Sequence, residues 1–526
     1  MTTAPLLLVG GMVLDGTGAR PPRAADVLVR DNRIEAVLDR ELGSAAAAGR
    51  DLPGAPRVDC SGAYVAPGFI DIHSHSDLAW LSNPDSLSRI SQGVTTEVVG
   101  NCGMSPAPRD PADSSFRQAI SVIDLDPDTP LAFATFAEYI QVLRAHRAAV
   151  NIVPLVGHGS IRQTALFSAT SSCPAVEIET LLRDALEAGA WGTSLGLMYP
   201  PGEAADQEEL AQVARITASS DALLTAHMRA YDAAGLLAAI DEVCDMATHT
   251  SVHLQLSHLR VLRASTSGIV DKCLERLDAA GPDVHADAYP YTAGQTTLFQ
   301  LLAAEDRREG VATFLGAVGR RRGRFAAGIA ATGYSPDKII VVRVTDPEDA
   351  NKVGRSLAEC ADEASCDWSE LAVDLLERSR GYVDVVVFGS NLSEQEQILA
   401  HEKVMIGSDG FSLSTDYPAT VHPRAFGAFP KALQLLVELG MPWAQAIAKA
   451  TGDPARKLGL ADRGTVQPGA IADLTVFDPD AFHDEATYEH PLRPAVGLRH
   501  VIVGGVPVID GGRRTGARPG RVLLKN

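Results

Sequence analysis

Two histidines separated by one residue, His73 and His75, close an apolar run that has the composition of a β-strand. Successive side chains of a strand point to opposite faces, so these two imidazole rings share one face while Ser74 points away. One face can therefore present both rings to a single metal ion. The pair alone leaves two interpretations open, a metal site or two structural histidines with ordinary hydrogen bonds.

Further metal-binding residue types follow other apolar runs along the chain. They are Cys102, His227, His258 and Asp409. In a parallel α/β barrel the catalytic residues lie at the carboxyl ends of the strands, which is where these residues stand. Each alone has an ordinary structural role as a buried thiol, a hydrogen-bonded histidine or a turn aspartate. Six such residues after several strands together predict a metal centre.

Imidazole and thiolate ligands together predict zinc, because magnesium and calcium prefer oxygen ligands. A zinc ion with three protein ligands keeps a position for water and lowers the pKa of that water toward neutrality. Asp409 is then the expected proton carrier, first as general base toward the water and later as general acid toward the leaving nitrogen. The predicted chemistry is zinc-dependent hydrolysis of a carbonyl compound.

Composition narrows the range of partners. The chain has 526 residues, and 46 basic against 66 acidic residues give a formal net charge of −20. This charge argues against nucleic acids and anionic membranes as partners. Seven scattered cysteines predict reduced thiols, and the N-terminus lacks a basic segment and a long apolar run. We therefore expect a cytoplasmic protein.

Apolar runs that alternate with helix-like segments predict βα units and a parallel sheet. We expect an α/β fold with a (β/α)8 TIM barrel over residues 63–463. The gap between the seventh and eighth strands is too long for one helix and predicts an insertion at about 295–380. The expected strands are 64–72, 94–99, 151–156, 191–195, 222–226, 252–257, 283–288 and 403–408.

The two ends of the chain share a pattern of short apolar runs and turn pairs. Residues 7–16 are LLVGGMVLDG, and residues 501–511 are VIVGGVPVIDG. Turn pairs between short apolar runs are typical of β-hairpins. We therefore expect residues 1–62 and 464–526 to form one small β-sandwich domain, with two unrelated hairpins as the alternative.

These motifs resemble those of the amidohydrolase superfamily and, within it, of the N-acyl-D-amino-acid deacylases, or D-aminoacylases. The stretch PGFIDIHSHSD at 67–77 is similar to a first-strand motif found across the superfamily. The stretch GNCGMSP at 100–106 is more specific, because hydantoinases and dihydroorotases use other ligand arrangements. Further similar stretches are GHG at 157–159, GLMYPPG at 196–202, AHMR at 226–229, LSH at 256–258, DAYPYTAG at 287–294, IGSDG at 406–410, HPR at 422–424 and ADL at 472–474.

The resemblance implies a zinc enzyme that removes the acyl group from an N-acyl-D-amino acid and leaves a carboxylate and a free D-amino acid. It implies one tightly bound zinc ion on Cys102, His227 and His258. A weaker second site would consist of His73, His75, Cys102 and Asp409. The number of ions needed for activity stays open.

The resemblance also places the substrate carboxylate near Arg260, Tyr289 and Arg424. Two positions depart from the family pattern, because Arg260 stands where lysine is common and Gln295 where a small hydroxyl residue is expected. Arginine keeps the positive charge and adds a planar fork for a carboxylate, but it is not interchangeable with lysine. The departures concern substrate selection rather than chemistry.

Two other classes of function remain open from the sequence. A hydrolase of cyclic amides, such as a hydantoinase or dihydropyrimidinase, or a dipeptidase would use a similar centre, but the Cys102 motif and Arg424 count against it. A metal-free scaffold that binds partners is expected to have lost ligands, whereas all six are present. The partner expected for the favoured function is a small N-acyl amino acid.

Overall fold

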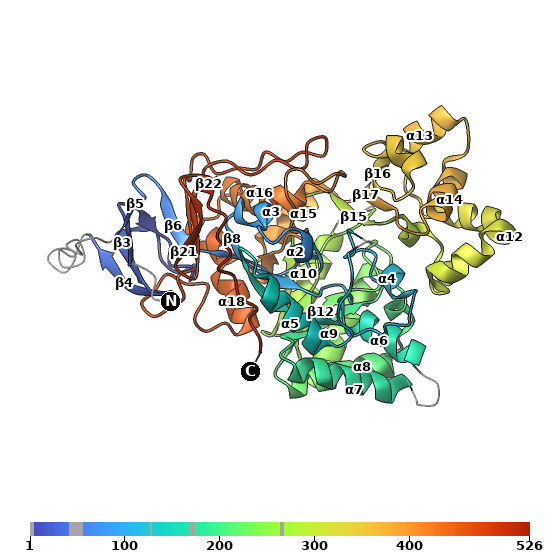
Figure 1. Cartoon of the computed structure of the whole chain (residues 1–526), viewed down its shortest axis with the longest axis horizontal. Helices are drawn as coiled ribbons and strands as arrows, with labels where there is room; N and C mark the ends of the chain where they lie inside the picture. The colour runs from blue at the N-terminus through green and yellow to red at the C-terminus, as the bar shows by residue number, and fades with distance from the viewer. Residues whose placement is uncertain (1–4, 41–55, 127–128, 169–173, 264–267, 526) are drawn as a thin grey trace.

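The computed structural model describes residues 5–40, 56–126, 129–168, 174–263 and 268–525. Strands from both ends of the chain lie on one side of a central α/β body, and a largely helical lobe stands on the other side (Figure 1). Within these residues no helix combines the length and the apolar character needed to cross a bilayer. The six cysteines described are unpaired, and Cys173 lies outside the described residues.

The central body is built from parallel strands. β7 (Phe69–Asp71), β8 (Val94–Val99) and β9 (Asn151–Pro154) pair in that order. A second run pairs in the order β10 (Val156–Gly157), β11 (Gly192–Gly196), β12 (Leu223–His227), β13 (His253–Leu256), β14 (Val284–Ala288) and β18 (Val404–Ile406). Only Leu155 separates β9 from β10, and a parallel bridge between Ser74 and Gly410 joins the ends of β7 and β18. The strands thus form the barrel that the sequence predicts.

Helices cover the outside of this barrel and follow the strands in the βα pattern. In α8 (Gln207–Ser219) the side chains of Leu210, Val213, Ala214 and Thr217 are buried, which is the spacing of one apolar helix face. Asp206 caps this helix by accepting a hydrogen bond from the backbone of Glu209. The main covering helices are α5 (Phe136–His146), α6 (His158–Ser168), α7 (Pro174–Glu187), α8 (Gln207–Ser219), α9 (Leu236–Thr250), α10 (Ile269–Ala279), α15 (Leu392–Ala400) and α16 (Arg424–Glu438).

Strands from both ends of the chain join in one ten-stranded sheet. The first end contributes β1 (Leu6–Val9), β2 (Met12–Val13), β3 (Arg23–Arg30), β4 (Arg33–Asp39), β5 (Arg57–Asp59) and β6 (Tyr64–Pro67), and the other end contributes β19 (Leu474–Phe477), β20 (Leu498–Val503), β21 (Val506–Asp510) and β22 (Arg513–Arg514). The two sets meet where β6 pairs antiparallel with β19. The ends of the chain therefore do not form unrelated hairpins.

The expected strand 64–72 is wrong in one respect, because it is two strands in two sheets. Residues 64–67 pair with β19, whereas Phe69 pairs with Val94 of the barrel. The chain changes sheet at Gly68, where an added Cβ would lie 2.2 Å from the Thr95 hydroxyl oxygen. Both strands are apolar, so their composition does not reveal the break.

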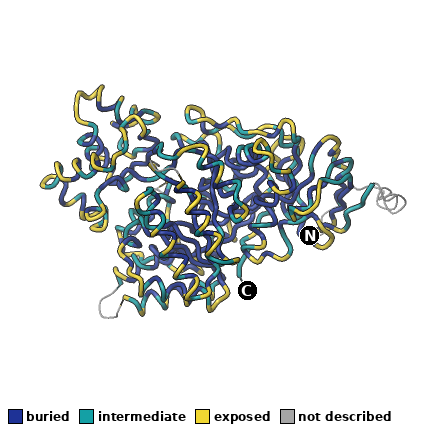
Figure 2. The backbone as a smooth tube through the Cα atoms, turned by 180° about the vertical axis from the view of Figure 1, so that it is seen from behind, coloured by how far each residue is buried: buried dark blue, intermediate teal, exposed yellow. Residues whose placement is uncertain are grey.

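Between β14 and α15, the chain forms the lobe at the right of Figure 1. Its sheet has β15 (Ala293–Thr297) and β16 (Ile339–Arg343) on either side of β17 (Asp384–Phe388). The helices α12 (Gly310–Ala330), α13 (Leu357–Ala364) and α14 (Trp368–Arg378) enclose a separate apolar core with this sheet. Buried backbone is densest in the barrel, while the lobe shows a large exposed surface (Figure 2).

Candidate metal centre and substrate pocket

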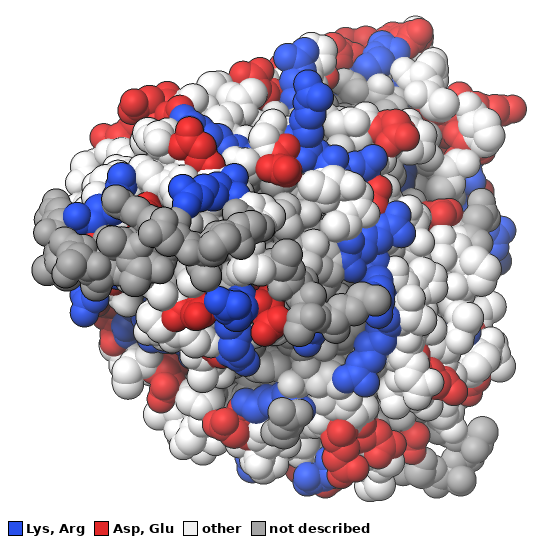
Figure 3. Space-filling model, turned by 60° about the vertical axis from the view of Figure 1, so that its left-hand side comes forward, with Lys and Arg blue, Asp and Glu red and all other residues white. Residues whose placement is uncertain are grey.

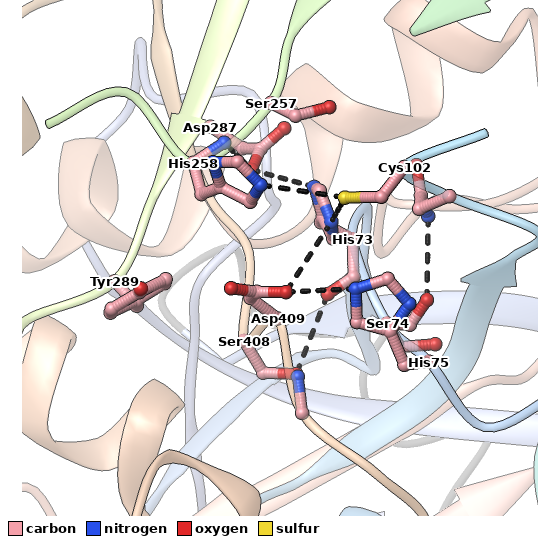
Figure 4. Close-up of polar contacts among 12 residues, drawn as sticks. His73, Ser74, His75, Cys102, Ser257, His258, Asp287, Tyr289, Ser408 and Asp409 are labelled. Atoms are coloured by element: carbon pink, nitrogen blue, oxygen red, sulfur yellow. Dashed lines mark hydrogen bonds and ion pairs between the residues drawn. The ribbon is translucent and has the colours of Figure 1, made fainter. Parts of the chain in front are cut away.

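All six predicted metal ligands lie together at the carboxyl end of the barrel. His73 and His75 follow β7, Cys102 follows β8, and His227 is the last residue of β12. His258 and Asp409 stand two and three residues after β13 and β18. Figure 4 shows His73, His75, Cys102, His258 and Asp409 pointing toward one another. Every one of the six is at most 5% exposed.

Three of these residues adopt a backbone conformation that is uncommon outside glycine. The φ angles of Cys102, His258 and Asp409 are 54°, 37° and 51°. Such left-handed backbone costs conformational energy and persists where the surrounding structure enforces it, often at functional sites. Here the left-handed residue turns the backbone sharply just after β8, β13 and β18.

The distances group the ligand atoms around common centres. The Cys102 Sγ atom lies 3.4 Å from the Nε2 atoms of both His73 and His258. The Asp409 Oδ1 atom lies 2.9 Å from His75 Nε2 and 3.6 Å from His73 Nε2. Ligand atoms within 4.8 Å of one another form three sets: His73, His75 and Cys102; Cys102, His227 and His258; and His73, His258 and Asp409.

The set Cys102, His227 and His258 fits a zinc ion. Tetrahedral zinc with its usual bond lengths holds sulfur and nitrogen ligands about 3.6 Å apart, close to the distance between Cys102 Sγ and His258 Nε2. Both ring nitrogens of His227 are buried without a hydrogen-bond partner among the described residues. A buried imidazole in that state is costly unless a ligand completes its bonding.

The electrostatics of the group favour a bound cation. Burial alone would raise the pKa of Cys102, but the neighbouring imidazoles of His73, His258 and His227 hold it well below its ordinary value. Burial lowers the pKa of His227 to about 4, so that ring is neutral and keeps a lone pair. A thiolate beside a neutral imidazole is the form in which these residues bind metals.

Asp409 is held as a carboxylate. Burial would raise its pKa, but Arg424, His258, His75 and His73 keep the pKa well below the ordinary value. Arg424 Nη1 lies 2.6 Å from Asp409 Oδ2, and His75 contacts the other carboxylate oxygen. The carboxylate is therefore ionised at neutral pH and fixed on both oxygens.

Asp287, near the end of β14, contacts two of the candidate ligands, His73 and His258. Its Oδ1 atom lies 3.1 Å from His73 Nδ1 and accepts a hydrogen bond of 2.7 Å from the backbone N–H of His258. Its other oxygen accepts from Gln255 at 3.1 Å. Sequence reasoning assigned no role to Asp287, although its place at the end of a barrel strand is a usable signal.

A buried arginine positions the turn that carries Asp409. Arg89 is fully buried, and its Nη1 atom lies 2.9 Å from Asp71 Oδ2 and 2.7 Å from Ser408 Oγ. The Ser408 backbone N–H donates to the other oxygen of Asp71 at 2.9 Å. This network was not predicted from the sequence, because an arginine in a helix between two strands is expected at the surface.

The residues predicted to bind a carboxylate adjoin the metal ligands. The Arg424 guanidinium lies 4.9 Å from the centre of the Tyr289 ring, and Arg260 donates a hydrogen bond to the Tyr289 hydroxyl. Both arginines therefore place positive charge beside Asp409. Gln295 accepts a hydrogen bond of 2.9 Å from the backbone of His422, two residues before Arg424.

Two polar residues in the resembling motifs have structural partners. His158 Nε2 lies 2.7 Å from Glu209 Oε1. Arg229 Nε lies 3.1 Å from both carboxylate oxygens of Glu242.

Two pockets, each of about 270 Å³, meet at Tyr199 and Gln300. The first is lined by His227 and Arg260 and also by Tyr334 of the lobe. The second begins at Met104, two residues after Cys102, and includes Phe299 and Val311. The lobe thus contributes walls to both pockets beside the metal ligands.

Comparisons with known proteins bear on this arrangement. A sequence model of the amidohydrolase family matches residues 57–312 and 400–509. The N-acyl-D-glutamate deacylase and the D-aminoacylase of Alcaligenes xylosoxydans xylosoxydans are 37% and 36% identical to this chain over 99% of its length. The alignments cover 96% and 97% of those proteins.

Solved structures agree with these sequence matches. The N-acyl-D-glutamate deacylase of Bordetella bronchiseptica, solved with zinc and a phosphonate that mimics the tetrahedral intermediate, has a TM-score of 0.82 and 33% identity. The alignment covers 99% of this chain and 100% of that one. A D-hydantoinase from Thermus sp., at 16% identity and a TM-score of 0.55 over 99% of both chains, shares the fold alone.

Full-length identity, the family match and the common fold therefore place this chain in the amidohydrolase family, among the N-acyl-D-amino-acid deacylases, as its motifs indicate.

Proposed function

We propose that this protein is a zinc-dependent hydrolase that removes the acyl group from N-acyl-D-amino acids. The products are a carboxylate and a free D-amino acid. The observation that carries this proposal is the convergence of Cys102, His227 and His258 beside the ionised Asp409 and the cation Arg424. This arrangement combines a zinc site, a base and a carboxylate-binding group at one end of the barrel.

Cys102, His227 and His258 would hold the tightly bound zinc ion. His73, His75, Cys102 and Asp409 would form the weaker second site. When bound, zinc polarises the amide carbonyl and lowers the pKa of a water molecule. The close imidazole and thiolate neighbours described above support both sites.

Asp409 acts as the proton carrier in this proposal. Its low pKa keeps it ready to accept a proton from the attacking water at neutral pH. The proton then passes to the amide nitrogen as the bond to the carbonyl carbon breaks. Arg424 and His75, on its two oxygens, fix the direction in which the carboxylate faces.

Arg260, Tyr289 and Arg424 bind the substrate α-carboxylate. Two guanidinium groups around one phenol offer charge-assisted hydrogen bonds for a planar anion. The pocket that contains Arg260 receives the amino-acid part, and the adjoining pocket beyond Tyr199 receives the acyl group. Apolar Phe299 and Val311 in the second pocket suit an acyl chain.

We retain three further assignments as proposals. Residues 1–62 and 464–526 form a β-sandwich domain, and 63–463 form the catalytic barrel with its insertion at about 295–380. The buried apolar side chains shared by β3, β6, β19 and β20 support the first assignment. The unpaired cysteines support a reducing compartment, and hence the cytoplasm.

Metal analysis and a substrate panel test the proposal together. We expect the purified protein to contain zinc and to hydrolyse N-acetyl-D-amino acids faster than their L enantiomers or a hydantoin. Removal of zinc by a chelator should abolish turnover, and added zinc should restore it. Preferred hydrolysis of the hydantoin or of the L enantiomers would contradict the proposal.

The thiolate assignment has a separate test. Cys102→Ala should lower the zinc content of the purified protein, because it removes one ligand of the tight site. Cys244→Ala is the matched control, since Cys244 is also a buried free thiol but lies in α9 away from the ligands. Full zinc occupancy in Cys102→Ala would remove this residue from the site.

A further inference from the structure

The pocket that contains Arg260 has a positively charged lining whose charges are almost all matched by carboxylates. Its arginines are Arg229, Arg260, Arg263 and Arg307. Arg229 is paired with Glu242, and Arg263 Nη2 lies 3.3 Å from Asp232 Oδ2. Arg260 is the exception, because among the described residues it contacts aromatic rings and the Tyr289 hydroxyl and forms no ion pair with a carboxylate.

Glu203 neutralises the fourth arginine. It lies in the short helix η1 (Gly202–Ala204) after β11, and it is only 6% exposed. Its Oε1 atom lies 2.9 Å from Arg307 Nη2 and 3.7 Å from Arg308 Nε, and its Oε2 atom lies 3.4 Å from Arg307 Nε. One buried carboxylate therefore engages two neighbouring arginines of the lobe.

The remaining donor of Arg307 is also occupied. Its Nη1 atom donates to the carbonyl oxygens of Gln300 and Leu302 at 3.1 and 3.0 Å. The backbone carbonyl of Glu203 in turn accepts from Arg229 at 2.9 Å. The guanidinium of Arg307 is thus held against Glu203 rather than presented to a ligand.

We infer that Glu203 makes this pocket selective for D-amino acids with uncharged side chains. The inference rests on the proposed function and refines its substrate. A substrate with an acidic side chain would bring a second carboxylate to arginines that already have one, and the buried Glu203 would repel it. Side chains such as Met198, Leu262, Leu301 and Val387 supply apolar contacts for an uncharged group.

The inference separates this chain from one of its relatives. The N-acyl-D-glutamate deacylase is 37% and the D-aminoacylase 36% identical to it, so sequence identity does not decide which amino acid this chain prefers. The ion pairs of the pocket favour an uncharged side chain. The site for the α-carboxylate is unaffected, because Arg260 forms no ion pair with a carboxylate among the described residues.

The sharpest test compares two substrates that differ by one charge and little in shape, N-acetyl-D-glutamine and N-acetyl-D-glutamate. We expect the wild-type zinc enzyme to show a kcat/KM at least about tenfold higher for the glutamine derivative, since juxtaposed like charges are strongly unfavourable. Glu203→Gln should shift the ratio of the two kcat/KM values toward glutamate by about tenfold or more, because it frees Arg307 and Arg308.

Glu305→Gln is the matched control. Glu305 lies on α11 (Ala304–Arg307), two residues from Arg307, but its side chain is 72% exposed and pairs with Arg324. The control makes the same change in net charge, so the substrate ratio should stay at the wild-type value. Zinc content and thermal unfolding of each variant show whether it is folded.

Equal or preferred hydrolysis of the glutamate derivative by the wild-type enzyme would overturn the inference, even if Glu203→Gln does not fold. An unchanged ratio in a folded Glu203→Gln variant would overturn it as well. Calorimetric titration with free D-glutamine and D-glutamate measures the same selectivity without turnover. Failure of the proposed function would instead appear as no hydrolysis of any N-acetyl-D-amino acid.

Discussion

The contacts of Asp409 are consistent with the two roles proposed for it, neighbour of the metal ion and base. His75 lies against one of its oxygens and Arg424 against the other. These cations stabilise the ionised form against the cost of burial, since the side chain of Asp409 is only 7% exposed. A neutral replacement of similar shape would keep the packing and lose the charge.

Asp409→Asn should therefore retain the tightly bound zinc and lose turnover. Loss of a positioned general base typically costs 10²–10⁴-fold in rate, and we expect kcat to fall by at least about 100-fold. The zinc content should stay near the wild-type value, because Cys102, His227 and His258 are unchanged. Turnover at the wild-type rate in a zinc-loaded variant would remove Asp409 from the mechanism.

Asp287 offers a test of the support behind the ligands. Its carboxylate faces His73 Nδ1 and accepts a hydrogen bond from the backbone of His258, so it would orient two of the proposed ligands. Loss of such an outer contact typically costs 10–100-fold in metal affinity. Asp287→Asn should weaken zinc binding by about that factor while excess zinc restores activity, as measured by titration against a chelator. Unchanged affinity would leave Asp287 with a purely structural role.

The proximity of the six candidate ligands could be predicted from the sequence because each stands at the end of an apolar run or just after it, and barrel geometry brings those positions together. The residues that hold these candidate ligands in place from outside, such as Arg89, could not be predicted in this way. Arg89 binds Asp71, 18 residues away, but its contacts with Ser408 and with the backbone carbonyls of Phe411 and Ala425 each join residues more than 300 apart in the sequence. The pairing of Glu203 with Arg307 likewise joins the barrel to the lobe across 104 residues.

At the scale of elements, β18, the strand that precedes Asp409, is fixed at its start by a buried lysine. Lys449, which follows α17 (Trp443–Ala448), is 4% exposed and donates hydrogen bonds to the carbonyls of His401 and Val404. Its own carbonyl accepts from Ile406 of β18 at 3.1 Å. Burial lowers the pKa of Lys449 to about 8.

This lowered pKa predicts a pH dependence of stability. Between about pH 8 and the unfolded lysine pKa of about 10.4, the unfolded chain binds more protons at this group than the folded one, so its contribution to stability rises with pH. Lys449→Met lacks this contribution. The wild type should therefore gain stability relative to Lys449→Met as the pH rises, by roughly 2–3 kcal/mol in free energy of unfolding from pH 7.5 to pH 10.5.

Comparison of the two proteins isolates Lys449 from the buried cysteines, which act in the opposite direction. Burial raises the pKa values of Cys60, Cys244 and Cys273 to about 12, so unfolding is favoured as pH rises above the ordinary thiol pKa. These groups are present in both proteins and cancel in the difference. Denaturant unfolding measures this difference at each pH. If the difference in free energy of unfolding between the wild type and Lys449→Met stayed constant across this pH range, the lowered pKa of Lys449 would be contradicted.

The elements themselves were predictable to different degrees. Strands β8, β12, β13 and β14 agree with their expected ranges to within a residue or two, because each is a short apolar run between turn residues. The division of residues 64–72 was not predictable, since it depends on which sheet each half joins. The fold of the lobe was not predictable either, because its core is formed by helices and antiparallel strands distant in sequence.

At the scale of the whole molecule, basic and acidic side chains both occur on the face shown in Figure 3. The contact between the terminal sheet and the barrel is different, because it depends on a buried polar junction. Asp473, just before β19, is 6% exposed. Burial raises its pKa, which Arg463 opposes.

Asp473 connects three parts of the chain. Its side chain accepts hydrogen bonds from the Gly504 backbone at 2.6 Å and from Asn151 of β9 at 3.1 Å, and it pairs with Arg463. Its backbone carbonyl accepts from Gly68 at 2.8 Å, where the chain passes from the terminal sheet into the barrel. The position of β7, and therefore of His73 and His75, depends on this junction.

Asp473→Ala should lower the free energy of unfolding by about 3–5 kcal/mol, because among the described residues it leaves the buried Arg463 with Asp462, 4.0 Å away, as its one remaining carboxylate partner. The double variant Asp473→Ala/Arg463→Met removes the unpaired charge and should recover part of that loss, as measured by denaturant unfolding. A double variant that is less stable than Asp473→Ala would show that Arg463 stabilises the junction without its partner. Recovery would instead show that the two charges act as one unit in joining the ends of the chain to the barrel.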